Sequence, residues 1–296
     1  MFYYFCQKKV LENDLFIIKF LFFEKCILCK CKIINSFLKM PKFNDFDLSW
    51  ENWKKYEDIL TDSLWVINER DKSWKHSNFY HGNFIPQIPN QLIKRYTKKW
   101  DYVLDLFLGS WTTAIECEKL ERNIIWVDIK EELVNRAKEL ITSDKIKKEF
   151  LLGNSGSKLT QNRIKTYLTL QNRKWADLVL LHPPYFDIIK FSDKKQDLSN
   201  APNITEFLKM FNKVLQNSFN LLKWGWYMWI IIGDKYQNSE WIPLWFQCMA
   251  EAQKVWFKLK SIIIKNMEWN RWKAWTWWIW RYRALNIFNK FNLIYE

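Results

Sequence analysis

The sequence predicts an α/β fold with a mainly parallel, seven-stranded sheet and helices on both faces. From Asp101 onward, short apolar runs alternate with longer amphipathic ones. This alternation is typical of a parallel sheet covered by its crossover helices. The chain has 296 residues, 49% of them hydrophobic, which is enough for one large domain of this class.

Each expected element is one run in that alternation. Strands are expected at 102–108, 123–128, 149–152, 177–182, 226–232 and 256–265, with a partial strand near 281–294. Helices are expected at 112–121, 130–141, 158–170, 203–223 and 238–254. Ligands of such sheets bind at the carboxyl ends of the strands, so we expect the functional residues there.

The residues before Asp101 form two further segments. Residues 1–39 are an atypical extension, which we interpret as an artefact of an upstream start rather than as a small extra helix. Their apolar run at 15–23 is too short to span a membrane and no signal-peptide cleavage pattern follows it, so we expect a cytoplasmic protein. Residues 40–100 are expected to be helical and looped, with an amphipathic helix within 50–70 and another opening at Pro89.

Glycine and tryptophan have unusual frequencies. Glycine accounts for 6 residues, about 2%, where about 7% is usual, and tryptophan for 20. Many Trp residues stand where turns require glycine, so we interpret sixteen of them as UGA codons that specify glycine; a genuinely Trp-rich protein is the alternative. The sixteen are Trp74, Trp100, Trp111, Trp126, Trp175, Trp224, Trp226, Trp229, Trp241, Trp245, Trp256, Trp269, Trp272, Trp275, Trp277 and Trp278. Counted as glycine, they bring that residue to about 7% of the chain.

The formal net charge is +14, of which the first 40 residues carry +4. A strongly basic chain favours a polyanionic partner, and nucleic acid is the first candidate. A solvated lysine-rich surface would give the same charge, so the charge alone does not decide between the two.

The six cysteines do not form a disulfide framework. Cys26, Cys29 and Cys31 are closely spaced, but no second set of ligands follows them, so we expect no metal site. Cys117 and Cys248 fall on expected helices and are expected to be buried thiols.

The stretch DLFLGSWTT, from Asp105 to Thr113, lies between an expected strand and helix. With Trp111 as glycine, it is a turn of small residues whose backbone N–H groups can face a ligand. A literal Trp111 is expected to crowd that ligand pocket. The next strand ends at Asp128, whose carboxylate could accept hydrogen bonds from two ribose hydroxyls or, alternatively, cap the following helix.

A second stretch, DLVLLHPPY, is an apolar strand that ends at His182 and continues into two prolines and Tyr185. Prolines fix the backbone and remove donors, so nearby carbonyls can face a substrate amino group. Tyr185 could stack on a planar base. The alternative is a strand terminator with a buried aromatic side chain.

Together these motifs resemble those of the amino-methylating DNA methyltransferases, which modify N4 of cytosine or N6 of adenine. DLFLGSWTT resembles the FxGxG-type turn of that class, IIWVDI its acidic residue after the second strand, and HPPY its (Asp/Asn/Ser)-Pro-Pro-(Tyr/Phe) motif. The resemblance extends over 63–285. It implies a Rossmann-like S-adenosylmethionine-dependent methyltransferase fold, with a catalytic domain at 101–296 and a cofactor site completed by 40–100.

The resemblance also implies roles for individual residues. The residues that would bind the cofactor, S-adenosyl-L-methionine, are Asp105, Phe107, Gly109, Ser110, Trp111, Thr112, Thr113 and Asp128. The residues that would hold a flipped-out base for catalysis are His182, Pro183, Pro184 and Tyr185.

Two features depart from the class. His182 replaces the usual Asp, Asn or Ser, which leaves adenine and cytosine both open as targets. No separate target-recognition domain is visible, so we expect DNA contacts from the loop at 265–283, the alternative being a solvated basic loop. The candidates for phosphate contact are Lys265, Arg271, Lys273, Arg281 and Arg283.

DNA is thus the expected partner, with a restriction nuclease as a further candidate. Two other functions stay open at this point. One is an RNA N-methyltransferase, because PPY motifs also serve that class. The other is a catalytically inactive nucleic-acid-binding protein.

Overall fold

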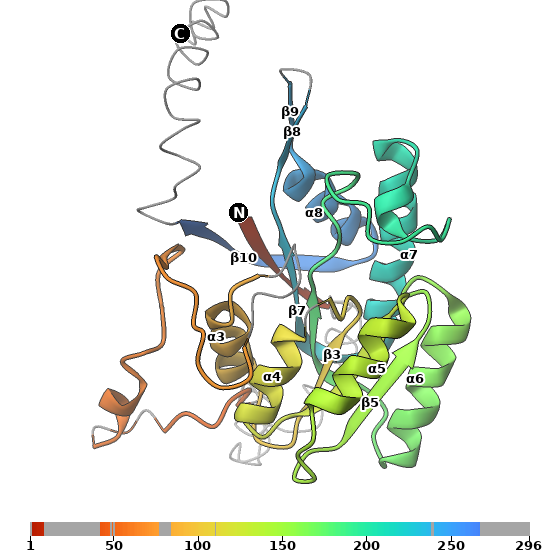
Figure 1. Ribbon diagram of the computed structural model, residues 1–296. Coiled ribbons are helices and arrows are strands. Elements are labelled where there is room, and N and C mark those ends of the chain that lie inside the picture. Colours follow the sequence, from red (N-terminus) through yellow and green to blue (C-terminus); the bar gives the residue numbers. More distant parts are fainter. Residues whose placement is uncertain are drawn as a thin grey trace, which may run out of the picture.

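The computed structural model describes residues 2–8, 42–47, 49, 51–76, 84–109, 111–237 and 240–266. Its centre is an eight-stranded sheet with the order β2-β10-β1-β7-β6-β3-β4-β5 (Figure 1). The strands are β1 (Phe2–Lys8), β2 (Leu64–Val66), β3 (Tyr102–Asp105), β4 (Asn123–Asp128), β5 (Lys148–Leu152), β6 (Ala176–Leu181), β7 (Leu222–Ile232) and β10 (Phe257–Asn266).

The five adjacent strands β7, β6, β3, β4 and β5 run parallel to one another, as the alternation predicts. β1 is antiparallel to both its neighbours, β7 and β10, and β2 is parallel to β10. The mainly parallel sheet is therefore confirmed. The expected count of seven is not, because β1 and β2 come from segments where no strand was expected, and 281–294 lies outside the described residues.

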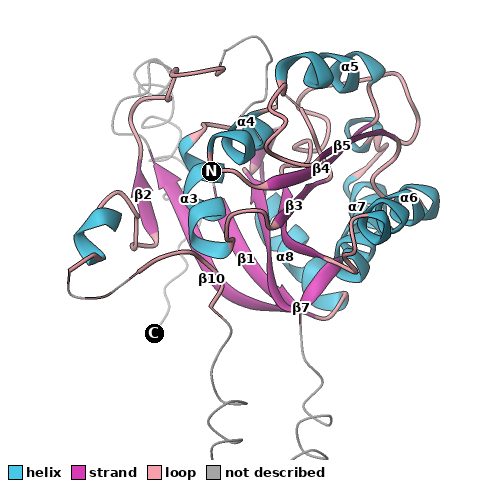
Figure 2. Ribbon diagram, turned by 90° about the horizontal axis from the view of Figure 1, so that it is seen from below, coloured by secondary structure: helices cyan, strands magenta, loops and turns pink. Residues whose placement is uncertain are grey.

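Helices cover both faces of the sheet (Figure 2). One face carries α3 (Gln87–Tyr96), α4 (Thr112–Lys119) and α5 (Glu131–Leu140); the other carries α6 (Lys158–Leu170), α7 (Ile204–Leu221) and α8 (Leu244–Lys254). Successive residues of a strand point to opposite faces, and Val103 and Leu104, both fully buried, belong to the two different cores. Neighbouring side chains of one short strand thus help to anchor both helical layers.

Two expected helices are wrong in part. Within 50–70 the structure has only a 3-10 turn, Trp53–Tyr56, and the short strand β2. In β2 the central Trp65 is buried between exposed neighbours, which is the period of a strand and not of a helix. The expected helix at 238–254 begins instead after Pro243, and the hairpin β8 (Lys235–Gln237) and β9 (Glu240–Ile242) precedes it. The residue before a proline is biased to extended backbone, which separates the hairpin from α8.

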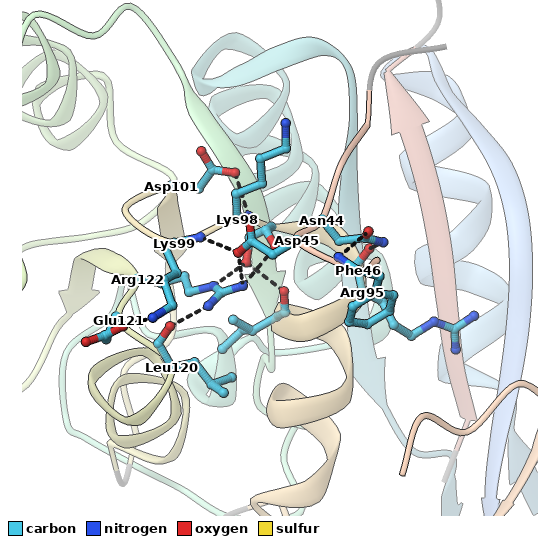
Figure 3. A network of polar contacts seen from close by, with 12 residues as sticks. Asn44, Asp45, Phe46, Arg95, Lys98, Lys99, Asp101, Leu120, Glu121 and Arg122 are labelled. Atoms are coloured by element: carbon cyan, nitrogen blue, oxygen red, sulfur yellow. Dashed lines mark hydrogen bonds and ion pairs between the residues drawn. The ribbon is translucent and has the colours of Figure 1, made fainter. Parts of the chain in front are cut away.

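The amino end of β4 is tied to the upstream segment by a buried arginine (Figure 3). Arg122 donates two hydrogen bonds to Thr97, from Nε to the side-chain Oγ1 at 3.0 Å and from Nη2 to the backbone carbonyl oxygen at 3.0 Å. Its Nη2 atom also lies 3.2 Å from Oδ2 of Asp45, which accepts from the backbone N–H of Lys99. The segment around Asp45 is therefore anchored at the edge of the sheet opposite the carboxyl ends of the parallel strands.

Within the described part of the chain, no helix combines the length and apolar character needed to cross a membrane. Cys117 and Cys248 are buried free thiols, which confirms that expectation.

Candidate functional site

The turn after β3 links two strand ends through backbone donors. The backbone N–H of Phe107 donates to Oδ1 of Asp105 at 2.9 Å. The N–H of Gly109 donates to Oδ2 of Asp128, at the end of β4, at 3.2 Å. Gly109 has φ +48°, a conformation that glycine adopts without a Cβ penalty. The turn therefore holds the Asp128 carboxylate beside the start of α4.

Trp111 is the N-cap residue of α4 with φ 64°, and its indole is buried. The indole Nε1 donates to the carbonyl of Leu133 at 3.0 Å, and the guanidinium of Arg136 lies 5.4 Å from the ring centroid. Both partners belong to α5, so the indole fills space between α4 and α5. The expectation that a literal Trp111 crowds the ligand pocket is therefore wrong.

Asp128 is not the cap of α5, because Lys130 occupies the N-cap position. Oδ1 of Asp128 accepts from the N–H of Lys130 at 2.8 Å. Together with the bond from Gly109, this fixes the carboxylate between two loops and leaves it at the wall of a cavity.

The HPPY stretch follows β6 directly, as expected. Nε2 of His182 lies 3.2 Å from the hydroxyl oxygen of Tyr185. The His182 ring also packs against Phe84, with ring centroids 4.7 Å apart. The Tyr185 ring lies against Gly233 just after β7, where an added Cβ would meet the ring at 3.0 Å. The motif is thus held on one side by the segment before α3 and on the other by the end of β7.

A buried carboxylate on α4 supports the segment that carries Phe84. Oε1 of Glu116 lies 2.6 Å from Nε2 of His76, and its Oε2 accepts from Nδ2 of Asn90 at 2.6 Å. The side chains of Glu116 and His76 are each 1% exposed. Because Asn90 fastens α3 to α4, the backbone at Phe84 lies close to an anchored helix.

Burial sets the protonation of the site. It raises the pKa of Asp105 to about 7 and that of Asp128 to about 6, because a charged carboxylate loses its water there. Burial lowers the pKa of His182 to about 3, so the imidazole is neutral at physiological pH. It also raises the pKa of the Tyr185 hydroxyl, which stays protonated.

A cavity of about 350 Å³ joins these elements. This lies within the range of roughly 300–1,000 Å³ that is usual for small-molecule sites. Eight of the predicted site residues line it: Phe107, Gly109, Thr112, Asp128, His182, Pro183, Pro184 and Tyr185. Asp105 and Thr113 are buried but are not part of its wall, and Ser110 lies outside the described residues.

Sequence reasoning missed several residues of the cavity wall. They are Phe84, Leu106, Leu108, Ile129, Lys130, Asn154, Ser155, Ile188, Ile189, Phe191, Gln196, Asp197 and Leu198. Asn154 and Ser155 follow the carboxyl end of β5, so the strand-end rule could have found them. Phe84 lies within 40–100, the segment expected to complete the cofactor site, but the sequence did not indicate which of its residues would reach the cavity.

The predicted basic loop is largely outside the described residues. Lys265 lies on β10, beside Trp65 of β2 in the sheet register. Arg271, Lys273, Arg281 and Arg283 are not described. Their contact with DNA stays a prediction, and Cys26, Cys29 and Cys31 also lie outside the described part.

Comparison with known proteins adds an independent observation. Residues 30–139 match the model of the DNA methylase family. Type II methyltransferase M.MjaII of Methanocaldococcus jannaschii is 33% identical over 91 residues, which are 28% of this chain and 17% of that protein. Type II methyltransferase M2.DpnII of Streptococcus pneumoniae is 29% identical over 112 residues, 36% of this chain and 38% of that protein.

Type II methyltransferase M.BglI of Bacillus subtilis is 35% identical over 81 residues, 27% of this chain and 21% of its own length. The chain thus covers between 17% and 38% of these relatives. Among solved structures, a TehB-like SAM-dependent methyltransferase from Corynebacterium glutamicum aligns at a TM-score of 0.38 and 12% identity, over 60% of this chain and 87% of that one.

Proposed function

We propose that the chain is an S-adenosylmethionine-dependent DNA methyltransferase that methylates the exocyclic amino group of a flipped-out base, N6 of adenine or N4 of cytosine. The observation that carries the proposal is one cavity bordered by the Gly109 turn, the Asp128 carboxylate and the His182–Tyr185 segment. The family match over residues 30–139 covers the first two of these features and supports the same chemistry.

The residues at the turn fit S-adenosylmethionine. The Asp128 carboxylate lies at the cavity wall, where it can accept hydrogen bonds from the two ribose hydroxyls. Gly109 has no side chain that would obstruct the approach of the methionine part. Asn154 and Ser155 line the same cavity and offer polar groups. When bound, the cofactor supplies a methyl group activated by a positively charged sulfur.

The HPPY segment fits the base. An exocyclic amine is a poor nucleophile because its lone pair is conjugated with the ring. A neutral His182 and the carbonyl of Pro183 would accept the amino hydrogens and favour a pyramidal nitrogen, while Tyr185 packs on the base. These residues position the reactants, which is where such a site gains most of its rate. The methylated amine must then lose one proton to solvent, and burial, which lowers the pKa of His182 to about 3, disfavours holding that proton on the imidazole.

Methyl transfer from labelled S-adenosylmethionine tests the proposal directly. Purified protein is incubated with unmethylated plasmid DNA or with total RNA, and the product is digested to nucleosides. N6-methyladenine or N4-methylcytosine in DNA is the expected result, lost in Asp128→Ala and in His182→Ala. Label in RNA alone would establish an RNA N-methyltransferase instead. Cofactor binding without transfer to either would leave a nucleic-acid-binding protein.

A partner restriction nuclease is part of the proposal. Extract of the source cells should then cut unmethylated DNA and leave DNA methylated by this protein intact. If the extract cuts methylated and unmethylated DNA equally, the proposal of a partner nuclease is wrong, while the proposed methyltransferase activity is not contradicted.

The proposal includes glycine at the sixteen Trp positions in the native protein. Seven non-glycine residues of the described part have positive φ, and four of them are Trp74, Trp100, Trp111 and Trp256, at 60° to 70°. All four belong to the sixteen. An L-residue pays about 1–2 kcal/mol for this conformation and glycine does not, which supports glycine at these positions.

A further inference from the structure

The segment after the HPPY motif is a self-braced loop beside the cavity. It runs over 187–200, and we call it the strap. Oγ of Ser192 donates to Oδ2 of Asp197 at 2.6 Å, and Asp197 also accepts from the N–H and Oγ of Ser199 through Oδ1. Nδ2 of Asn200 donates to the carbonyls of Ser192 and Lys194 at 2.6 and 2.9 Å. These bonds close the strap on itself, so it has a defined shape.

The start of the strap is fixed by two further interactions. Lys235, whose side chain is 6% exposed, forms an ion pair with Asp187. Phe186 has φ 56°, a conformation that costs a bulky residue energy and persists only where packing enforces it. Its ring is buried, 5.8 Å from the Phe207 ring and 4.8 Å from Nζ of Lys235. The direction in which the chain leaves Tyr185 is therefore set.

This direction carries two adjacent apolar side chains to the cavity mouth. Ile188 and Ile189 line the cavity and yet are 48% and 39% exposed. Both are β-branched and have few rotamers, so they keep one shape when the base site is empty. These two apolar side chains are exposed on a braced loop next to the proposed base-binding wall. Core packing does not explain their position, because they are not buried in either core.

We propose that Ile188 and Ile189 are the wedge that fills the space left in duplex DNA when the target base rotates out. This inference rests on the proposed function. Rotating a base out of the duplex costs its stacking energy, and apolar side chains inserted between bases can offset that cost. The partner is duplex DNA because Lys190 and Lys195 are exposed on the strap of a chain with net charge +14. Of the strap's acidic residues, Asp187 is paired with Lys235 and Asp197 is buried in the strap's own hydrogen bonds. The ion pair of Lys190 with Asp193 is largely exposed, 64% and 96%, so a phosphate can replace the carboxylate.

The test compares two forms of one substrate. Ile188→Ala/Ile189→Ala is assayed in single-turnover methyl transfer on unmethylated plasmid DNA that has been linearised, as duplex and as single strands after heat denaturation and rapid cooling. The wedge is needed only where a base must leave a stack. We therefore expect at least about a tenfold loss on duplex and less than about a twofold loss on single strands. Ile188→Leu/Ile189→Leu keeps the apolar bulk and should retain duplex activity.

Leu159→Ala is the matched control, because Leu159 lies on α6, is 70% exposed and does not line the cavity. It should change neither rate. An equal loss on both DNA forms, or no loss on duplex, would overturn the wedge while leaving the methyltransferase in place. A double variant that no longer binds S-adenosylmethionine would be replaced by the two single variants, judged by the same duplex-to-single-strand ratio. No transfer by the unchanged protein to either form would overturn the proposed function and this inference with it.

Discussion

The Nε2 atom of His182 lies 3.2 Å from the hydroxyl oxygen of Tyr185, across the two prolines that separate them in sequence. A neutral imidazole has one donor and one acceptor nitrogen. The partner of Nε2 therefore determines what the other nitrogen can offer to a substrate. Tyr185 thus orients His182, in addition to the contact with a base that we propose for it.

Tyr185→Phe is expected to lower the rate of methyl transfer by about tenfold, because it removes the hydroxyl that orients His182 and keeps the ring. Tyr185→Ala should lose considerably more. Cofactor affinity should be nearly unchanged in Tyr185→Phe, so single-turnover rates and S-adenosylmethionine binding are measured together. Tyr236→Phe, on the β8–β9 hairpin, is the control. A full rate in Tyr185→Phe would show that the hydroxyl does not orient the imidazole.

Cofactor affinity is expected to depend on pH through Asp128, whose pKa burial raises to about 6. The ionised carboxylate accepts hydrogen bonds from ribose hydroxyls better than the protonated acid, so binding lowers this pKa. Affinity should be full above pH 6 and fall by up to about tenfold per unit below it. Calorimetric titration between pH 5 and pH 8 measures this, and Asp128→Asn should bind weakly with little pH dependence. If the affinity of Asp128→Asn for S-adenosylmethionine fell with pH as steeply as that of the unchanged protein, the pH dependence would belong to another group.

Asp105 is expected to cost stability at neutral pH. Its pKa is raised from 3.8 to about 7 in the folded protein, so the folded state disfavours the charged form. The contribution of Asp105 to stability is therefore fully present below about pH 4 and is lost as the pH rises to about 7. Asp105→Asn keeps an oxygen for the Phe107 N–H and should raise Tm at pH 8 but not at pH 4. A lower Tm for Asp105→Asn at pH 8 would contradict this account.

The glycine interpretation predicts UGA at the sixteen codons, and UGG at Trp111 and Trp224 would end it. It also predicts that Trp256, 60% exposed with φ 70°, prefers glycine to alanine. Trp256→Gly should be more stable than Trp256→Ala by about 1 kcal/mol, as measured by denaturant unfolding. Lys165, exposed within α6, should show the opposite order when replaced by Gly and by Ala. An alanine preference at both positions would contradict the prediction.

A chain beginning at Met40 is expected to fold and methylate as well as the full chain. This is a demanding prediction, because β1 (Phe2–Lys8) pairs with both β7 and β10. The sequence predicts another strand near 281–294, which could pair with the same edges once β1 is removed. Circular dichroism and methyl-transfer assays of the shortened chain are the measurements. An insoluble or inactive product would establish 1–39 as an integral part of the fold.

The local sequence pattern predicted those helices and strands whose hydrophobic period is visible within their own residues. β4 has the predicted bounds of 123–128 and α6 those of 158–170. β2 was not predicted because its pairing partner, β10, is distant in the sequence. The β8–β9 hairpin was not predicted because its apolar residues also fit the pattern of a helix. Pairing between remote segments leaves little trace in a local window.

The candidate site divides in the same way. The Gly109 turn, Asp128 and the HPPY segment were predictable, because strand ends in a parallel sheet converge at one edge. The segment 40–100 was expected to complete the site, but the contact of Phe84 with His182 is long-range, so the sequence did not predict which residue makes it. The direction of the Trp111 side chain was predicted wrongly, because it depends on the space between α4 and α5 and on the carbonyl of Leu133.

One contact of the strap has a kinetic consequence. Nζ of Lys194 donates to the carbonyl of Ile129 at 2.5 Å, so the loop at the base end is linked to the loop beside Asp128. If spent cofactor leaves past this link, the strap has to move, and the strap is the part that we propose faces DNA. Reloading would then require release of the DNA. We therefore expect a distributive enzyme, which dissociates after each methylation instead of travelling to the next site on the same molecule.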